Sequence, residues 1–60
     1  MKIGVLGAGQ LGRMLALAGH PLGLSFVFLD PADNACAAPV GDQIQADFYD
    51  TAALARLCET

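Results

Sequence analysis

The sequence contains no tryptophan and few charged residues, and its basic residues are scarcest of all. Only three of its 60 residues are lysine or arginine, against six aspartates and glutamates, and the formal net charge is −3. A nucleic-acid backbone is bound mainly by clustered lysine and arginine side chains, and no such cluster is present. The composition therefore argues against nucleic acid as a partner.

Long apolar runs are also missing. The longest stretch without a charged residue, 14–29, is interrupted by His20, Pro21 and two glycines. It is typical of a helix, a turn and a strand rather than of a membrane span. The first residues lack the basic start and the small-residue cleavage site of a signal peptide. We therefore expect a cytoplasmic protein that does not bind membranes.

Cysteine is limited to two residues, Cys36 and Cys58, which lie far apart and match no metal-ligand spacing. We expect both to be reduced thiols that pack as small apolar side chains. No pattern in the chain predicts a metal site or a catalytic residue.

Apolar residues, in contrast, are abundant, since 55% of the chain is hydrophobic. A chain of this size buries only about 60% of its unfolded surface, so it is marginal on its own. We expect residues 1–60 to be the N-terminal part of a larger domain. Alternatively, homodimerisation or other self-association would bury the apolar surface.

The spacing of the apolar residues predicts strands that alternate with helices. Strands are predicted at 2–6, where the strand is apolar enough to be buried, and at 25–29 and 43–46; helices are predicted from Gln10 into the segment 19–23 and over 51–58, with a short helical turn over 32–37. Such alternation favours a parallel sheet with right-handed crossovers. The predicted fold is a Rossmann-like, three-layer α/β fragment in the order β-α-β-(short helix)-β-α.

Both long helices are predicted to be amphipathic. The apolar face of the first comprises Leu11, Met14, Leu15 and Ala18. The last helix is predicted to be capped by Asp50 and to present Leu54, Leu57 and Cys58 on its apolar face. Pro39 and Gly41 are expected to break the short helical turn before the third strand.

The turn Gly7-Ala8-Gly9-Gln10-Leu11-Gly12 joins the first strand to the first helix. Gly7 allows a tight turn, Gly9 lets a ligand approach the backbone, and Gly12 lets the helix sit close to the sheet. The free N–H groups and the dipole of the helix start favour an anion there. In this context the motif predicts a phosphate-binding turn.

Two residues bear on which phosphate is bound. Asp30 ends the second strand, where an acidic residue holds the ribose of NAD, but it equally suits a cap for the turn that follows. Gln10 brings an amide, both donor and acceptor, to the mouth of the turn. From these residues a dinucleotide and a sugar phosphate both stay open.

Other polar residues are explained by structure. Arg13 is expected to be solvated or ion-paired rather than bound to phosphate, and His20 to lie near a helix C-terminus. Asp47 and Asp50 flank Phe48 and Tyr49, and a loop with a helix cap accounts for them better than a catalytic carboxylate pair.

The stretch 2–14 resembles the N-terminus of the N5-carboxyaminoimidazole ribonucleotide synthetase family, the ATP-dependent part of phosphoribosylaminoimidazole carboxylase. The resemblance continues through 15–19, 21–23, 28–31 and 46–50, and its most specific piece is Gly-Gln-Leu-Gly-Arg-Met at 9–14. It implies an ATP-grasp enzyme of purine biosynthesis that uses ATP, Mg²⁺ and bicarbonate to carboxylate aminoimidazole ribonucleotide.

The resemblance also implies which regions of the enzyme bind ATP, Mg²⁺ and the substrate. In that superfamily ATP and Mg²⁺ bind to later regions, so the ATP-grasp and C-terminal domains would lie outside these residues and the 60-residue chain would be inactive by itself. The substrate phosphate would be held by Gly9, Gln10, Leu11 and Gly12, with Gln10 and Leu11 matching the contact positions of a related formyltransferase. Two alternatives remain: the start of an NAD(P)-dependent oxidoreductase, supported by Asp30, and a non-enzymatic self-associating module.

Overall fold

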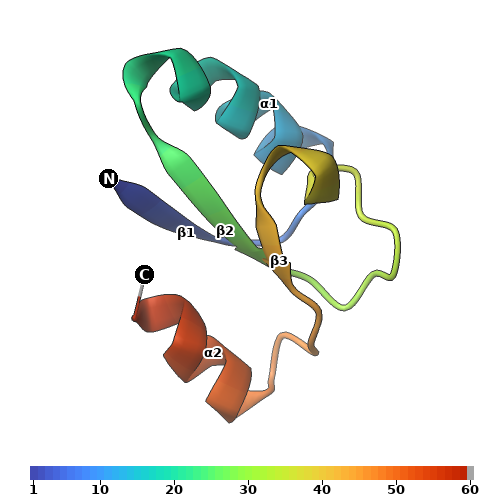
Figure 1. Cartoon of the computed structure of the whole chain (residues 1–60). Helices are drawn as coiled ribbons and strands as arrows, with labels where there is room; N and C mark the ends of the chain where they lie inside the picture. The colour runs from blue at the N-terminus through green and yellow to red at the C-terminus, as the bar shows by residue number, and fades with distance from the viewer. Residues whose placement is uncertain (60) are drawn as a thin grey trace.

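The computed structural model describes residues 1–59 as a three-stranded parallel sheet with a helix on each face (Figure 1). In chain order the elements are β1 (Lys2–Leu6), α1 (Gln10–Gly19), the 3-10 turn η1 (His20–Leu22), β2 (Ser25–Leu29), the 3-10 turn η2 (Ala38–Val40), β3 (Asp42–Ile44) and α2 (Thr51–Cys58). The predicted α/β architecture is confirmed.

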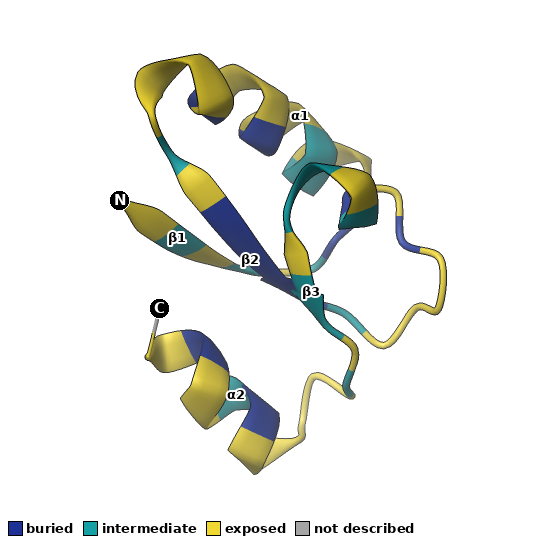
Figure 2. Ribbon diagram, viewed as in Figure 1, coloured by how far each residue is buried: buried dark blue, intermediate teal, exposed yellow. Residues whose placement is uncertain are grey.

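The strand β2 lies at the centre of the sheet, in the order β1-β2-β3. Its side chains alternate between the two faces and build two separate clusters. Phe26 and Phe28 pack on the α1 side, while Val27 and Leu29 pack on the α2 side. In Figure 2 the buried residues accordingly run along β2 and the inner sides of both helices. This arrangement gives the three layers expected from the sequence.

The strand β1 is less buried than the sequence predicted. It pairs with β2 in parallel register from Lys2–Ser25 to Leu6–Leu29, but the described residues place no strand on its other side. Leu6, at its carboxyl end, is 63% exposed. The prediction of a buried strand was therefore wrong for β1, because a strand with a single neighbour keeps one edge open.

The helix α1 contacts the sheet through small residues and not through its large ones. Ala16 and Gly19 are buried, and a Cβ built on Gly12 would lie 3.1 Å from Cε1 of Phe28. The helix packs directly on the two phenylalanine rings of β2, as the predicted role of Gly12 required. The small side chains, spaced at i, i+4 and i+7, make this close approach possible.

The predicted apolar face of α1 is therefore not buried against the sheet, and that prediction was wrong. Leu11, Met14, Leu15 and Ala18 are exposed. The helix did end as expected, with η1 after Gly19 and a left-handed Gly23 at φ 80°.

The segment between β2 and β3 differs from its prediction. Residues 32–37 form turns rather than a helical turn, and the 3-10 turn comes later, at η2. Pro39 is the second residue of that turn and does not break it, since the first positions of a helix need no N–H donor. The strand β3 begins one residue before the predicted 43–46 and ends two residues earlier, where its pairing with β2 stops at Ile44.

The helix α2 begins as predicted, since the side chain of Asp50 accepts a hydrogen bond of 3.0 Å from the N–H of Ala53. Its buried residues are Ala53 and Leu57, with Leu54 packed beside them. Cys58 is exposed, and so is Cys36, so the prediction that the cysteines pack as apolar side chains was wrong. Both thiols are free, as expected.

Candidate phosphate-binding site

The glycine turn lies at the carboxyl end of β1, directly before α1. Gly7 has a φ of 100°, a left-handed conformation that favours glycine, and its N–H donates a 2.7 Å hydrogen bond to the carbonyl of Leu29. The predicted tight turn at Gly7 is thus confirmed. The carboxyl ends of parallel strands are where open α/β sheets bind their ligands.

The start of α1 offers backbone donors to a ligand. Within residues 1–59, the N–H groups of Gln10, Leu11 and Gly12 find no protein acceptor, whereas that of Arg13 donates to the carbonyl of Gly9 at 3.0 Å. The first turn of α1 contains no acidic side chain that would compete with an anion. A Cβ built on Gly9 would meet no atom within 4 Å, so the space in front of the turn is open. This end of α1 can hold a phosphate.

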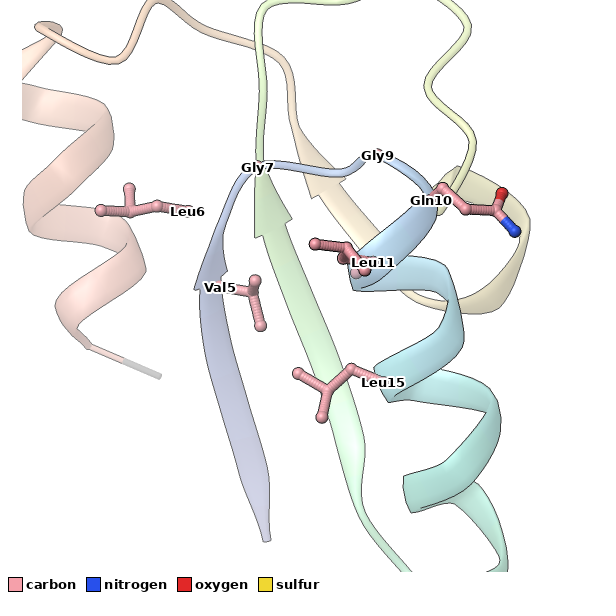
Figure 3. Close-up of a pocket in the computed structure, with 8 residues that line it drawn as sticks. Val5, Leu6, Gly7, Gly9, Gln10, Leu11 and Leu15 are labelled. Carbon is pink, nitrogen blue, oxygen red and sulfur yellow. The ribbon is translucent and has the colours of Figure 1, made fainter.

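An open groove of about 440 Å³ continues from the turn along the free side of β1. Its walls are mostly aliphatic: Val5 on β1 faces Leu11 and Leu15 on α1, whereas Leu6 borders the groove with its backbone and turns its side chain to the opposite side of β1 (Figure 3). The glycine backbone lies at one end of the groove, so a ligand there would place a polar group on the turn and an apolar part below it.

The side chain of Gln10 extends away from this groove, whereas Leu11 and Leu15 point towards it (Figure 3). Its Oε1 accepts a hydrogen bond of 3.1 Å from the Sγ of Cys36, in the loop after β2. The acceptor end of the amide is therefore occupied, and its NH₂ group is the end left to donate to an anion.

The guanidinium of Arg13 lies at the surface. Its Nη1 donates to the carbonyl of Cys36 at 3.3 Å. This exposed bond ties the first turn of α1 to the loop after β2, and it is compatible with the solvated side chain that the sequence predicts as one of two alternatives. His20 does lie at the end of α1, as expected, with its ring centroid 6.0 Å from that of Phe26.

Asp30 links the two loops at this edge of the sheet. Its Oδ2 accepts a 2.9 Å hydrogen bond from the N–H of Ala8, and its Oδ1 accepts one of 2.8 Å from the N–H of Ala32. The bond from Ala8, and next the bond from Ala32, hold the pKa of the Asp30 carboxyl below its ordinary value, against a smaller opposing effect of burial. Asp30 thus accepts a backbone N–H two residues later, as the capping interpretation predicted, although the segment that it caps forms turns rather than a helix.

Asp47 and Asp50 both accept hydrogen bonds from backbone N–H groups a few residues later in the chain. The side chain of Asp47 accepts from the N–H of Tyr49 at 2.8 Å, while Asp50 caps α2. The prediction of a loop with a helix cap is confirmed, and these carboxylates lie at the start of α2, away from the glycine turn.

Gln43 is a residue of this site that the sequence did not reveal. Its Nε2 donates to the carbonyls of Asp30 and Ala32, both at 3.0 Å. The sequence predicts only that Gln43 lies in a strand. No local signal indicates that its side chain would contact the loop before that strand.

No group of three or more His, Cys, Asp or Glu residues within 1–59 is arranged to hold a metal ion. None of the helices in the described residues is long and apolar enough to cross a membrane.

Fold and turn together define an α/β domain of Rossmann type with a glycine-rich turn after its first strand. The family model for the ribonucleotide synthetase pre-ATP-grasp domain matches residues 1–60. The chain belongs to this family.

Curated and solved relatives agree with that assignment. The chain is 63% identical over 59 residues to the N5-carboxyaminoimidazole ribonucleotide synthase of Pseudomonas aeruginosa, covering 98% of this chain and 16% of the relative. The crystal structure of the corresponding synthetase from Thermus thermophilus matches with a TM-score of 0.91 at 61% identity, over 98% of this chain and 16% of that one.

A synthetase structure from Staphylococcus aureus, complexed with ADP, matches with a TM-score of 0.92 at 37% identity, over 97% of this chain and 16% of that one. The chain thus spans about a sixth of the length of the relatives it matches.

Proposed function

We propose that this chain is the N-terminal, substrate-binding segment of an N5-carboxyaminoimidazole ribonucleotide synthase. In this proposal the N–H groups of Gln10, Leu11 and Gly12 hold the phosphate of aminoimidazole ribonucleotide, and Gly9 leaves room for it. The observation that carries the proposal is the set of free donors at the start of α1, in a chain of the ribonucleotide synthetase family.

The proposed parent enzyme carboxylates aminoimidazole ribonucleotide with bicarbonate, in the cytoplasm, at the expense of ATP. Residues 1–60 would supply the N-terminal part of its pre-ATP-grasp domain, while the ATP-grasp and C-terminal domains would come from further chain. ATP and Mg²⁺ would bind to those further domains. The 60-residue chain would then be inactive alone.

A chimera tests this function. Residues 1–59 of this chain replace the matching segment of the Pseudomonas aeruginosa synthase, to which they are 63% identical. We expect ATP consumption that depends on both aminoimidazole ribonucleotide and bicarbonate. A folded chimera that lacks ribonucleotide-dependent ATP consumption, while the unaltered Pseudomonas enzyme shows it, would count against the proposal.

The isolated chain is also proposed to self-associate, as a homodimer or a larger assembly. Support comes from the open edge of β1 and from the neighbouring apolar side chains Leu6, Leu11, Met14 and Leu15, which are 49–81% exposed. An uncovered strand edge beside an apolar surface favours pairing with another chain.

A further inference from the structure

The feature that extends this proposal is the double hydrogen bond of the Asp30 carboxylate. One oxygen accepts the N–H of Ala8 in the glycine turn, 22 positions earlier, and the other accepts the N–H of Ala32 in its own loop. Asp30 directly follows β2, and the glycine turn directly follows the neighbouring strand β1. The carboxylate therefore bridges two loops at the same edge of the sheet.

Ala8 is held on both sides by this second loop. Its N–H donates to Asp30, and its carbonyl accepts a 2.8 Å hydrogen bond from the N–H of Ala37. The residue is fully buried, with an exposed fraction of 0%. Neither polar backbone group of Ala8 is left for a ligand, so the donors that remain in the turn come after it.

Further hydrogen bonds hold the loop that carries Asp30. The amide of Gln43 holds the carbonyls of Asp30 and Ala32, which fixes the backbone that carries the carboxylate. Arg13 and Gln10 add contacts from α1 to Cys36 in the same loop. The direction of the N–H groups at the start of α1 therefore depends on the loop after β2.

We propose that Asp30 is a positioning residue for the ribonucleotide phosphate: by holding the N–H of Ala8, it orients the free N–H groups of Gln10, Leu11 and Gly12. This inference rests on the proposed function. A carboxylate that faced the phosphate directly would repel it. The Asp30 carboxylate instead accepts the N–H groups of Ala8 and Ala32, so it affects phosphate binding through the position of the backbone. Its role differs from that of an acidic residue that binds a ribose hydroxyl.

The test is Asp30→Asn in the chimeric synthase. Asparagine has nearly the same shape, but its NH₂ group faces an N–H donor and one of the two hydrogen bonds is lost. We expect the KM for aminoimidazole ribonucleotide to rise about ten-fold, as for the loss of one charge-assisted hydrogen bond. The KM for ATP and kcat should change little, because the turn does not contact ATP.

The matched control is Asp33→Asn, the same chemical change in the same loop. The side chain of Asp33 is exposed and has a single contact of 3.5 Å, from Nε2 of Gln45. This variant should leave both KM values unchanged. Gln43→Ala provides a second test that leaves the carboxylate in place, and it should raise the KM for the ribonucleotide in the same direction by a smaller factor.

The outcomes separate the two proposals. An unsubstituted chimera without ribonucleotide-dependent activity overturns the proposed function. An active chimera in which Asp30→Asn and Gln43→Ala leave the ribonucleotide KM unchanged overturns the positioning role alone. A parallel rise in the KM for ATP and for the ribonucleotide also overturns it, since that pattern indicates a general loss of structure. If Asp30→Asn gives no folded protein, Gln43→Ala decides.

Discussion

A Cβ atom built on Gly19 would lie 2.5 Å from Cζ of Phe26, so α1 rests directly on that aromatic ring. Gly19 has an ordinary helical φ of −83°, and its backbone would tolerate any residue. Packing alone therefore requires glycine here. Gly19→Ala should destabilise the chain by about 1–3 kcal/mol, the usual cost of overpacking a core.

Urea unfolding followed by circular dichroism measures this cost. Gly23→Ala is the control, because its site is open but its φ is 80°. It should cost about 1 kcal/mol through backbone strain alone. A neutral or stabilising Gly19→Ala would contradict the packing described here.

The cap of α2 gives a second prediction. Asp50→Ala removes the acceptor of the Ala53 N–H and should cost about 0.5–2 kcal/mol of stability. Asp50→Ser, which keeps a side-chain acceptor, should recover most of the loss in the same urea titration. Equal loss in both variants would show that the cap contributes nothing.

The depressed pKa of Asp30 predicts a loss of stability in acid. Because the folded-state pKa lies below the ordinary value of 3.8, the contribution is fully present above that pH. It is lost as the pH falls through the lowered pKa, when the carboxylate takes up a proton and its bonds to Ala8 and Ala32 weaken. Asp30→Asn should be less stable than the parent chain at pH 7, and the difference should shrink below pH 3.8. A difference that is constant with pH would argue against it.

Self-association should depend on the groove beside β1. Leu15→Glu places a charge at its wall, where the leucine is 49% exposed, and should shift the isolated chain towards monomer in sedimentation analysis. Leu22→Glu is the control, since Leu22 is 77% exposed but lies in η1, outside the groove. Identical sedimentation of the parent chain and the Leu15→Glu variant would show that the groove does not mediate self-association.

The positions of the main elements could be predicted from the sequence, but the face that α1 turns to the sheet could not. The large side chains of Leu11 and Leu15 dominate the apolar pattern of that helix, whereas its contact face is built on Gly12, Ala16 and Gly19. Small residues give a weak hydrophobic signal. Their fit depends on phenylalanines in the next strand, and helix periodicity does not contain that information.

The candidate site shows the same limit. The glycine turn was predictable because its residues are local and follow a strand directly. The bond from Ala8 to Asp30 joins residues 22 positions apart, and the bonds of Gln43 reach back 11 and 13 positions. Such contacts follow from strand order and register. The sequence alone therefore could not decide whether Asp30 binds a ribose or caps the turn that follows it.

A crystal structure of the chimeric synthase with aminoimidazole ribonucleotide bound is the sharpest test of phosphate binding at the start of α1. We expect phosphate oxygens within hydrogen-bonding distance of the N–H groups of Gln10, Leu11 and Gly12. A bound ribonucleotide whose phosphate lies away from this turn would contradict it.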